Sequence, residues 1–410
     1  MSLQQDNIPK KNIYKAGIVG AGLMGHGIAY SIAFSGIKTV LIDTSMAKVE
    51  SALNKIKIIL TKDIESGIIS KIEFQKIIES ITISDNYETL DRCDLIIEAV
   101  YEDKELKDSI ISNANKLLNT EGVIASNTST IPISVLANST NRPENFIGLH
   151  FFSPVHKMKL VEIINGKLTS SKTTSIAIDF VNFINKKPIV VNDGPGFFTT
   201  RVFQCYTNEG MALLNEGIKP EDIEQIAKKA GYPIGPLAIL DEISINLASH
   251  IRNQIKKYSP IKKELPYNPW DIVLNLMISK LNRTGRSGGK GFYEYPNNEG
   301  KHLWKGLSNH FPLSNSTIKE VDIIDRFYFS QALETIRCLE EKIVESFDDA
   351  NTGSILGWGF PKKTGGILSF VNNYGILAFK NRSEYLKNNY GNRFKPPRLL
   401  VKMAKTSKSF

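Results

Sequence analysis

The feature that most constrains the fold of this chain is a glycine-rich turn between two short apolar segments. The apolar residues 16–19 lead into the sequence GAGLMG at 20–25, and a helical pattern then continues to about Phe34. A second apolar run, residues 39–42, ends at Asp43. A strand, a tight turn, a helix and a second strand in this order form a βαβ unit, so the sequence predicts parallel strands at the start of the chain.

Further short apolar runs follow, and helical patterns separate the earlier ones. Strands that alternate with helices predict the α/β class with a mostly parallel sheet. Residues 46–80 form two helical patterns, which is more than a simple crossover needs, so we expect a helical hairpin that projects from the sheet. The apolar runs lie at 95–100, 123–125, 146–149, 160–164 and 189–191.

The segment 192–196, Asn-Asp-Gly-Pro-Gly, breaks this pattern, and the chain beyond it is helical in character. The sequence predicts a Rossmann-type domain at 13–192 and two all-helical C-terminal repeats at 193–296 and 320–405. The alternative to a duplication is a chance similarity between two amphipathic helices. The matching positions are Arg201, Glu209 and Glu216 in the first copy and Arg326, Glu334 and Glu341 in the second, followed by turns at 231–233 and 357–359.

Composition limits the class of protein. The three cysteines, Cys93, Cys205 and Cys338, form no C-x-x-C pair, which predicts reduced intracellular thiols and no structural metal site. The polar N-terminal residues 1–15 do not form a secretory signal, and no apolar stretch reaches the length of a membrane span. We therefore expect a cytoplasmic protein, or a mitochondrial or peroxisomal one in a eukaryotic host.

The net charge of +9 has two interpretations. It indicates either a partner rich in phosphate, such as coenzyme A or a nucleotide, or a solvated surface rich in lysine. The basic residues are scattered apart from the tail and do not cluster with aromatic residues, so nucleic-acid binding is not expected.

The glycine turn predicts a dinucleotide site, because it follows a strand, opens a helix and precedes an acid at the end of the next strand. Gly20 allows the tight turn, Gly22 lets the backbone approach a pyrophosphate, and Gly25 lets helix and strand pack closely. Asp43 accepts hydrogen bonds from ribose hydroxyls and repels a 2′-phosphate, which predicts NAD rather than NADP. FAD and a glycine turn without ligand are the alternatives.

A candidate catalytic pair follows from two later strands. His150 lies near the end of one strand, and Glu162 lies inside the apolar run that returns beside it. A carboxylate in an apolar strand is costly without a partner, and a histidine partner would gain the basicity and fixed tautomer of a general base. Each residue alone could equally be structural. His156 is interpreted as structural, and His26 as packing near the cofactor without chemistry.

A polar segment, residues 126–130, follows another apolar strand. Its hydroxyls and amide can meet a substrate oxygen or the nicotinamide, or they can form a turn or helix cap.

These residues, taken together, resemble the 3-hydroxyacyl-CoA dehydrogenases in order and spacing. The resemblance runs from about residue 14 to 400 and extends to the dehydrogenase half of the multifunctional β-oxidation enzymes, without their hydratase half. The motifs that carry it are the glycine turn, Asp43, and residues 98–102, 126–129, 148–154, 160–162, 193–197, 289–293, 359–361 and 365–366.

The resemblance implies a reaction and a set of roles. The chain would oxidise L-3-hydroxyacyl-CoA to 3-ketoacyl-CoA reversibly with NAD, in fatty-acid β-oxidation or short-chain acyl-CoA metabolism. His150 would be the base, Glu162 its orienting partner, and Ser129 a catalytic residue that contacts substrate and cofactor. The helical hairpin would help to hold coenzyme A. The implied cofactor residues are Gly20, Gly22, Leu23, Met24, Gly25, Asp43, Val100, Glu102, Lys107, Ser129 and Ser153; the implied substrate residues are Ser129 and Thr200.

The chain also departs from the family pattern. Thr200 stands where an asparagine that binds the substrate oxygen is common, and Ser153 replaces another asparagine. An alternative function is therefore a catalytically weakened subunit that binds acyl-CoA and NAD. A dehydrogenase of free β-hydroxyacids is a third hypothesis, but such enzymes commonly use a catalytic lysine.

The resemblance also bears on partners. A hydratase or thiolase step would belong to a separate protein. Single-repeat relatives dimerise through their helical domain, so a second repeat predicts a monomer or a loose homodimer.

Overall fold

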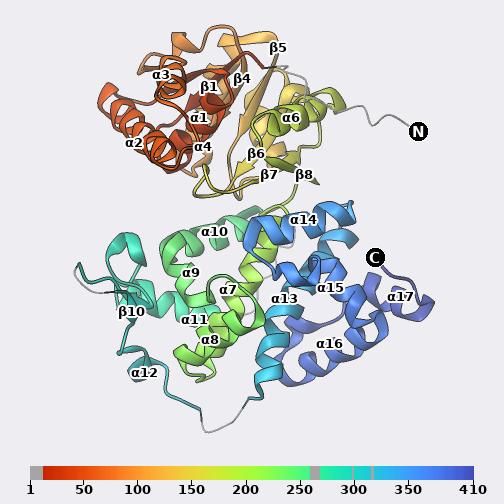
Figure 1. The fold of residues 1–410 in the computed structure, drawn as a ribbon. Helices are drawn as coiled ribbons and strands as arrows, with labels where there is room; N and C mark the ends of the chain where they lie inside the picture. Colours follow the sequence, from red (N-terminus) through yellow and green to blue (C-terminus); the bar gives the residue numbers. More distant parts are fainter. Residues whose placement is uncertain (1–12, 259–267, 298–299, 315–317) are drawn as a thin grey trace. The chain divides into compact units, whose positions relative to one another are not determined.

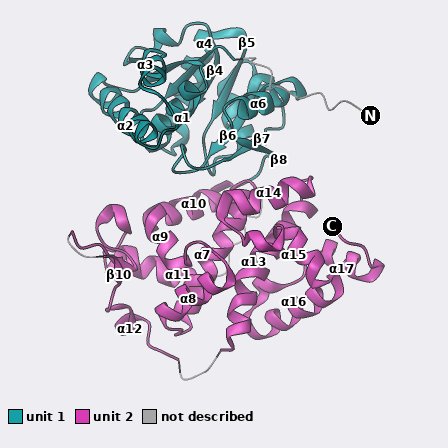
Figure 2. Cartoon of the chain, viewed as in Figure 1, with its two compact units in different colours: residues 1–194 teal, residues 195–410 magenta. Residues whose placement is uncertain are grey.

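The computed structural model describes residues 13–258, 268–297, 300–314 and 318–410, and it forms two compact units. Unit 1 comprises Met1–Gly194 and unit 2 comprises Pro195–Phe410 (Figure 2). Asp193 belongs to unit 1, where its carboxylate accepts hydrogen bonds from the backbone N–H groups of Ile133 (2.9 Å) and Ser134 (2.7 Å). Most of the polar N-terminal segment lies outside the described residues.

The described part of unit 1 contains an eight-stranded sheet in the order β3-β2-β1-β4-β5-β6-β7-β8. The only antiparallel neighbours in this sheet are β6 and β7, so the prediction of a mostly parallel α/β sheet is confirmed. The chain reverses its direction of strand addition between β1 and β4, which is the switch point of a doubly wound sheet. The strands are β1 Lys15–Val19, β2 Lys38–Ile42, β3 Ile81–Ser84, β4 Cys93–Glu98, β5 Leu118–Ser126, β6 Phe146–Phe151, β7 Leu160–Asn165 and β8 Lys187–Asn192.

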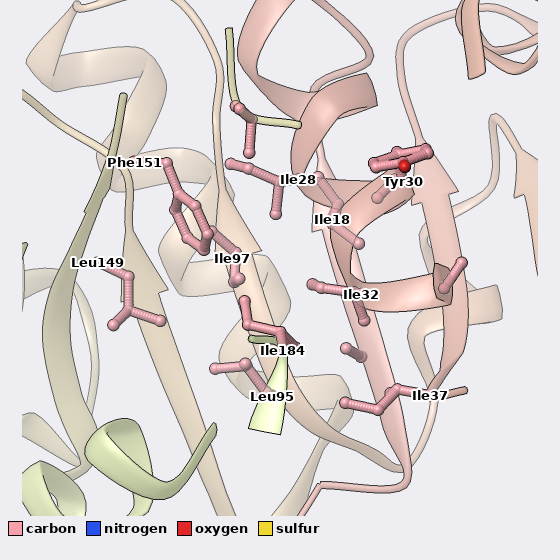
Figure 3. Packing of buried hydrophobic residues seen from close by; sticks show 14 of the residues in the cluster. Ile18, Ile28, Tyr30, Ile32, Ile37, Leu95, Ile97, Leu149, Phe151 and Ile184 are labelled. Carbon is pink, nitrogen blue, oxygen red and sulfur yellow. The ribbon is translucent and has the colours of Figure 1, made fainter. Parts of the chain in front are cut away.

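Helices cover both faces of the sheet because successive strand residues, which point to opposite faces, are apolar. Leu95 and Ile97 of β4 pack with Ile28 and Ile32 of α1 in one buried cluster (Figure 3). Ile96 lies between them in the chain and is also fully buried, as a strand with two covered faces requires. The helices of unit 1 are α1 Leu23–Phe34, α2 Met46–Glu65, α3 Lys71–Glu79, α4 Lys104–Leu117, α5 Ile133–Leu136 and α6 Ser171–Phe183 (Figure 1).

The segment 46–80 forms the predicted pair of helices, α2 and α3. Ser70 starts α3 with a capping box, because its hydroxyl accepts from the Glu73 N–H while the Glu73 carboxylate accepts from the Ser70 N–H. Three isoleucines of this segment are exposed: Ile58 in α2, Ile68 in the connection and Ile72 in α3.

The described residues of unit 2 form helices and one short pair of strands. In the described residues of the chain, no helix is both long and apolar enough to cross a bilayer. The helices are α7 Thr199–Asn215, α8 Pro220–Ala230, α9 Pro236–Ile243, α10 Ile245–Tyr258, α11 Pro269–Asn275, α12 Leu307–His310, α13 Glu320–Glu340, α14 Phe347–Trp358, α15 Ile367–Tyr374, α16 Ile376–Tyr390 and α17 Arg398–Thr406.

The two predicted repeats meet where α7 and α13 pack side by side (Figure 1). Arg201 at the start of α7 binds Glu334 (2.6 Å) near the end of α13. Arg326 in α13 binds Glu209 (2.5 Å) and Glu216 (2.6 Å) at the other end of α7. Each arginine thus binds the glutamates of the other predicted repeat, so the contact between α7 and α13 is reciprocal. Both predicted repeats lie within one compact unit, and their division into domains at 193–296 and 320–405 remains a prediction.

The predicted helical character of the C-terminal part is confirmed, with the exception of two short strands. Strands β9 Tyr293–Glu294 and β10 His302–Leu303 form an antiparallel pair. The buried carboxylate of Asp241 organises this segment by accepting hydrogen bonds from the N–H groups of Phe292 (2.9 Å) and Tyr293 (2.8 Å). Burial raises the pKa of Asp241 to about 6. This contact is long-range in sequence, and a local helical pattern does not report it.

Candidate active site

The glycine turn has the shape of a dinucleotide cradle. Gly20 has a φ of +105°, and a Cβ atom there would lie 2.7 Å from the Ala99 carbonyl oxygen. A Cβ on Gly25 would lie 1.7 Å from the Gly20 carbonyl oxygen. A Cβ on Gly22 would meet nothing within 4 Å, so this glycine faces open space at the start of α1. The residues therefore fit a pyrophosphate that approaches the helix N-terminus.

This geometry predicts opposite effects for two matched substitutions. Gly25→Ala should destabilise unit 1 by about 3 kcal/mol, because the methyl group has no room against the backbone. Gly22→Ala should leave the free energy of unfolding within about 0.5 kcal/mol of the original value, yet weaken NADH binding strongly. Urea unfolding and NADH titration separate the two quantities. Equal stability losses in the two variants would contradict this account.

Asp43 lies at the carboxyl end of β2, beside the glycine turn. Its carboxylate accepts hydrogen bonds from the N–H groups of Ala21 (2.8 Å) and Thr44 (2.7 Å) and pairs with Lys48 (3.2 Å). Burial alone would raise the pKa of Asp43, but these hydrogen bonds and Lys48 lower it below its ordinary value. The group is therefore an ionised acceptor at neutral pH, as binding of a ribose diol requires.

His150 and Glu162 face each other across the antiparallel pair β6–β7, in direct register. The Glu162 Oε2 atom lies 2.9 Å from His150 Nδ1, and both side chains are buried. When Nδ1 donates to the carboxylate, Nε2 keeps its lone pair and can accept a proton. Nε2 lies 3.1 Å from the hydroxyl of Ser129, which belongs to the polar segment 126–130 at the end of β5.

The loop that carries Ser129 is held by Glu102. The Glu102 Oε1 atom accepts hydrogen bonds from the N–H groups of Ser129 and Thr130 (both 3.0 Å) and from the hydroxyls of Thr128 (2.5 Å) and Thr130 (2.8 Å). Glu102, implied as a cofactor residue, therefore also positions Ser129.

The other implied residues have different surroundings. Leu23 and Ser153 are exposed, and Met24 and Val100 are half-buried. Lys107 is 1% exposed and binds carboxylates rather than facing solvent. Thr200 is buried in α7 of unit 2, separate from the unit that holds His150. The roles of all these residues in binding remain predictions.

His26 and His156 were interpreted as outside the chemistry. The Nδ1 atom of His26 lies 2.8 Å from the Gly22 carbonyl oxygen, and the His156 ring packs edge-on against Tyr30 at 6.1 Å.

Two residues of the site have positions that the sequence did not predict. The Asn127 side-chain oxygen accepts from the Phe151 N–H (2.8 Å) and joins β5 to the strand of His150. Glu98 ends β4 as a fully buried carboxylate. The signal for Glu98 was present, because Glu98 lies inside an apolar run, as Glu162 does.

A doubly wound sheet with a dinucleotide cradle and a buried histidine–carboxylate pair at its strand ends defines a nicotinamide-dependent dehydrogenase. Residues 15–194 match the family model described as the NAD binding domain of 3-hydroxyacyl-CoA dehydrogenase, and residues 196–295 match the model of its C-terminal domain. The chain belongs to the 3-hydroxyacyl-CoA dehydrogenase family. The predicted family and the NAD cofactor are thereby confirmed.

Individual relatives support this membership. The chain is 33% identical to the (S)-3-hydroxybutyryl-CoA dehydrogenase of Ralstonia eutropha, with a TM-score of 0.65 over 70% of this chain and 100% of that one. It is 34% identical to the fatty acid oxidation complex subunit alpha of Shewanella amazonensis over 90% of this chain and 52% of the relative. The chain thus spans about half the length of that curated relative.

A third comparison concerns the fold alone. The 3-hydroxybutyryl-CoA dehydrogenase of Escherichia coli is 21% identical and has a TM-score of 0.81, covering 96% of this chain and 99% of its own. The shared fold therefore extends over nearly all of the chain, unit 2 included.

Proposed function

We propose that this chain catalyses the reversible oxidation of L-3-hydroxyacyl-CoA thioesters to 3-ketoacyl-CoA. The observation that carries the proposal is the contact of His150 with Glu162 on one side and Ser129 on the other. NAD⁺, when bound, supplies the hydride acceptor. His150 takes the proton of the substrate hydroxyl through Nε2, and Glu162 stabilises the imidazolium that results. In the reverse direction the protonated His150 returns the proton to the keto oxygen.

Ser129 completes this arrangement by its position. Its hydroxyl contacts Nε2, and its backbone is held by Glu102. A hydroxyl in this place can hydrogen-bond the substrate oxygen and keep it within reach of the base.

The direct test is consumption of NADH with acetoacetyl-CoA and with a longer 3-ketoacyl-CoA. Turnover with either substrate supports the proposal. Its absence for both, in a chain that binds the nucleotide and the thioester, would favour the second candidate, a catalytically weakened acyl-CoA and NAD-binding subunit. Thr200 motivates that candidate, because its side chain is shorter than the asparagine common in the family. The dependence of kcat/KM on acyl-chain length then defines the substrate range.

The wider role follows from the same proposal. We infer that the chain acts in fatty-acid β-oxidation or short-chain acyl-CoA metabolism, with a separate enoyl-CoA hydratase or thiolase handling the neighbouring steps. All three cysteines are free thiols, which supports a reducing compartment, the cytoplasm or an organelle in a eukaryotic host.

The packing of unit 2 supports a prediction about assembly. Single-repeat relatives are expected to dimerise through their helical domain, and in this chain helix α7 of the first predicted repeat is packed against α13 of the second through the reciprocal arginine–glutamate contacts. Light scattering across a range of concentrations should therefore report a monomer or a weak dimer. A tight dimer that depends on residues 197–295 would contradict this expectation.

A further inference from the structure

Glu98 is a buried carboxylate with both oxygens engaged. It is 1% exposed at the end of β4. Its Oε1 atom accepts hydrogen bonds from Lys107 Nζ (2.7 Å) and the Val100 N–H (2.8 Å), and its Oε2 atom accepts from the Ser126 hydroxyl (2.6 Å). A charge in so dry a place persists only when it is paired and hydrogen-bonded, as it is here.

Lys107 joins this carboxylate to a second one. Its ammonium group lies 2.7 Å from Glu98 Oε1 and 3.3 Å from Glu102 Oε2. Burial opposes the charge of Lys107, but Glu98 and Glu102 together raise its pKa. Burial likewise opposes the charge of Glu102, but Lys107 and the threonine hydroxyls lower its pKa. Glu98, Lys107 and Glu102 form an acid–lysine cluster with two negative charges, one positive charge and a net charge of about −1.

The cluster lies at the place where a doubly wound sheet binds its ligand. Glu98 is in direct register with Val19, the last residue of β1, and Gly20 follows immediately. The pair β1–β4 is the switch point, where the dinucleotide crosses the strand ends. The other end of the cluster, Glu102, holds the loop of Ser129, which contacts His150. The surplus negative charge therefore lies between the cradle and the reacting centre.

The two forms of the cofactor differ in charge at the reacting ring. The nicotinamide ring of NAD⁺ carries a positive charge, and that of NADH does not. A fixed negative charge in a poorly solvated site stabilises the first form relative to the second.

We propose that the acid–lysine cluster sets the preference of the site between oxidised and reduced nicotinamide, and that Glu98 is the positioning residue that holds the cluster together. Its net negative charge favours NAD⁺ relative to NADH, while Glu102 fixes Ser129. This inference rests on the proposed NAD-dependent function.

The test uses the full chain and measures the Kd of NAD⁺ and of NADH by calorimetry in four proteins. Glu98→Gln makes the cluster neutral, and Lys107→Met gives it a net charge of −2. The double variant, Glu98→Gln with Lys107→Met, returns it to −1 with uncharged side chains in place of the pair. The ratio of the NAD⁺ Kd to the NADH Kd should rise on the order of tenfold in Glu98→Gln, fall in Lys107→Met, and return to the original value in the double variant.

A matched control is Glu121→Gln. It removes one negative charge from an exposed position of β5 that pairs with Lys172, and it should leave the ratio unchanged. If the cluster has only a structural role, the losses of nucleotide affinity should add in the double variant. The ratio of the NAD⁺ Kd to the NADH Kd should then be the same in all four proteins.

Three outcomes decide the matter. An unchanged ratio in Glu98→Gln, with both nucleotides still bound, overturns the inference and leaves the proposed function intact. If Glu98→Gln does not fold, the comparison moves to Lys107→Met against the double variant, and equal ratios there overturn it. If the unsubstituted protein binds neither nucleotide, the proposed function itself is wrong.

Discussion

Replacement of His150 by alanine is expected to lower kcat about 10²- to 10⁴-fold while leaving the Kd of NADH nearly unchanged. The reason is that Nε2 of His150 is placed to accept the proton. Nδ1 is held by the Glu162 carboxylate at 2.9 Å, and Nε2, on the other side of the ring, lies 3.1 Å from the Ser129 hydroxyl. The loss of the imidazole removes the base but not the glycine cradle or Asp43. Turnover follows the absorbance of NADH with acetoacetyl-CoA as substrate.

The matched control is His156→Ala in the same unit. His156 is exposed and packs only its ring edge against Tyr30, so kcat should stay within a few-fold of the original value. A second control, Glu162→Gln, keeps the shape of the partner but removes its charge, and its kcat should fall between those of the two histidine variants. Normal turnover in His150→Ala would remove His150 from the mechanism.

Replacement of Arg326 by methionine is expected to destabilise the protein by about 3–5 kcal/mol. The Arg326 side chain is fully buried, and its Nε and Nη atoms bind Glu209 and Glu216. Without the guanidinium, Glu209 keeps only its contact with Arg393 inside a buried helix pair. Urea unfolding, followed by fluorescence and by circular dichroism, measures the loss.

Unit 2 supplies its own control, because Arg201 is the counterpart of Arg326 in the first copy. The side chains of Arg201 and its partner Glu334 are each 16% exposed, and that of its second partner Glu341 is 51% exposed, so water screens Arg201 more than it screens the fully buried Arg326. Arg201→Met should cost about 1 kcal/mol. Equal losses for the two variants would show that burial does not distinguish the two halves of the reciprocal contact.

Much of unit 1 could be predicted because its signals are local. The glycine turn, the apolar strands and the helical hairpin each lie within about 30 consecutive residues, and their periodicity fixes the element type. The pair His150–Glu162 was also accessible, since a carboxylate inside an apolar strand requires a partner. Glu98 was accessible in principle by the same argument, but its partner Lys107 belongs to a charged helix whose lysines are ordinarily solvated.

The contacts of unit 2 were harder to predict because they join distant residues. The recurrence of arginine and glutamate indicated a duplication, but spacing alone did not say that each arginine binds the glutamates of the other copy. The Asp241 carboxylate and the N–H groups of Phe292 and Tyr293 are about fifty residues apart, and so the β9–β10 hairpin was missed. Pairings of this kind depend on chain topology rather than on local propensity.

The reciprocal contact of α7 and α13 has an evolutionary consequence. In a dimer of two identical chains, a substitution in the interface changes both sides at once. In unit 2 both sides belong to one chain, so a substitution changes one side only, and the two predicted repeats can diverge independently. When the two predicted repeats are aligned so that Arg201 matches Arg326, Thr200 matches Asp325. Asp325 accepts a hydrogen bond from Arg382 Nε at 2.7 Å within unit 2. The second predicted repeat therefore has an internal ion pair at the position where the first has the hydroxyl of Thr200.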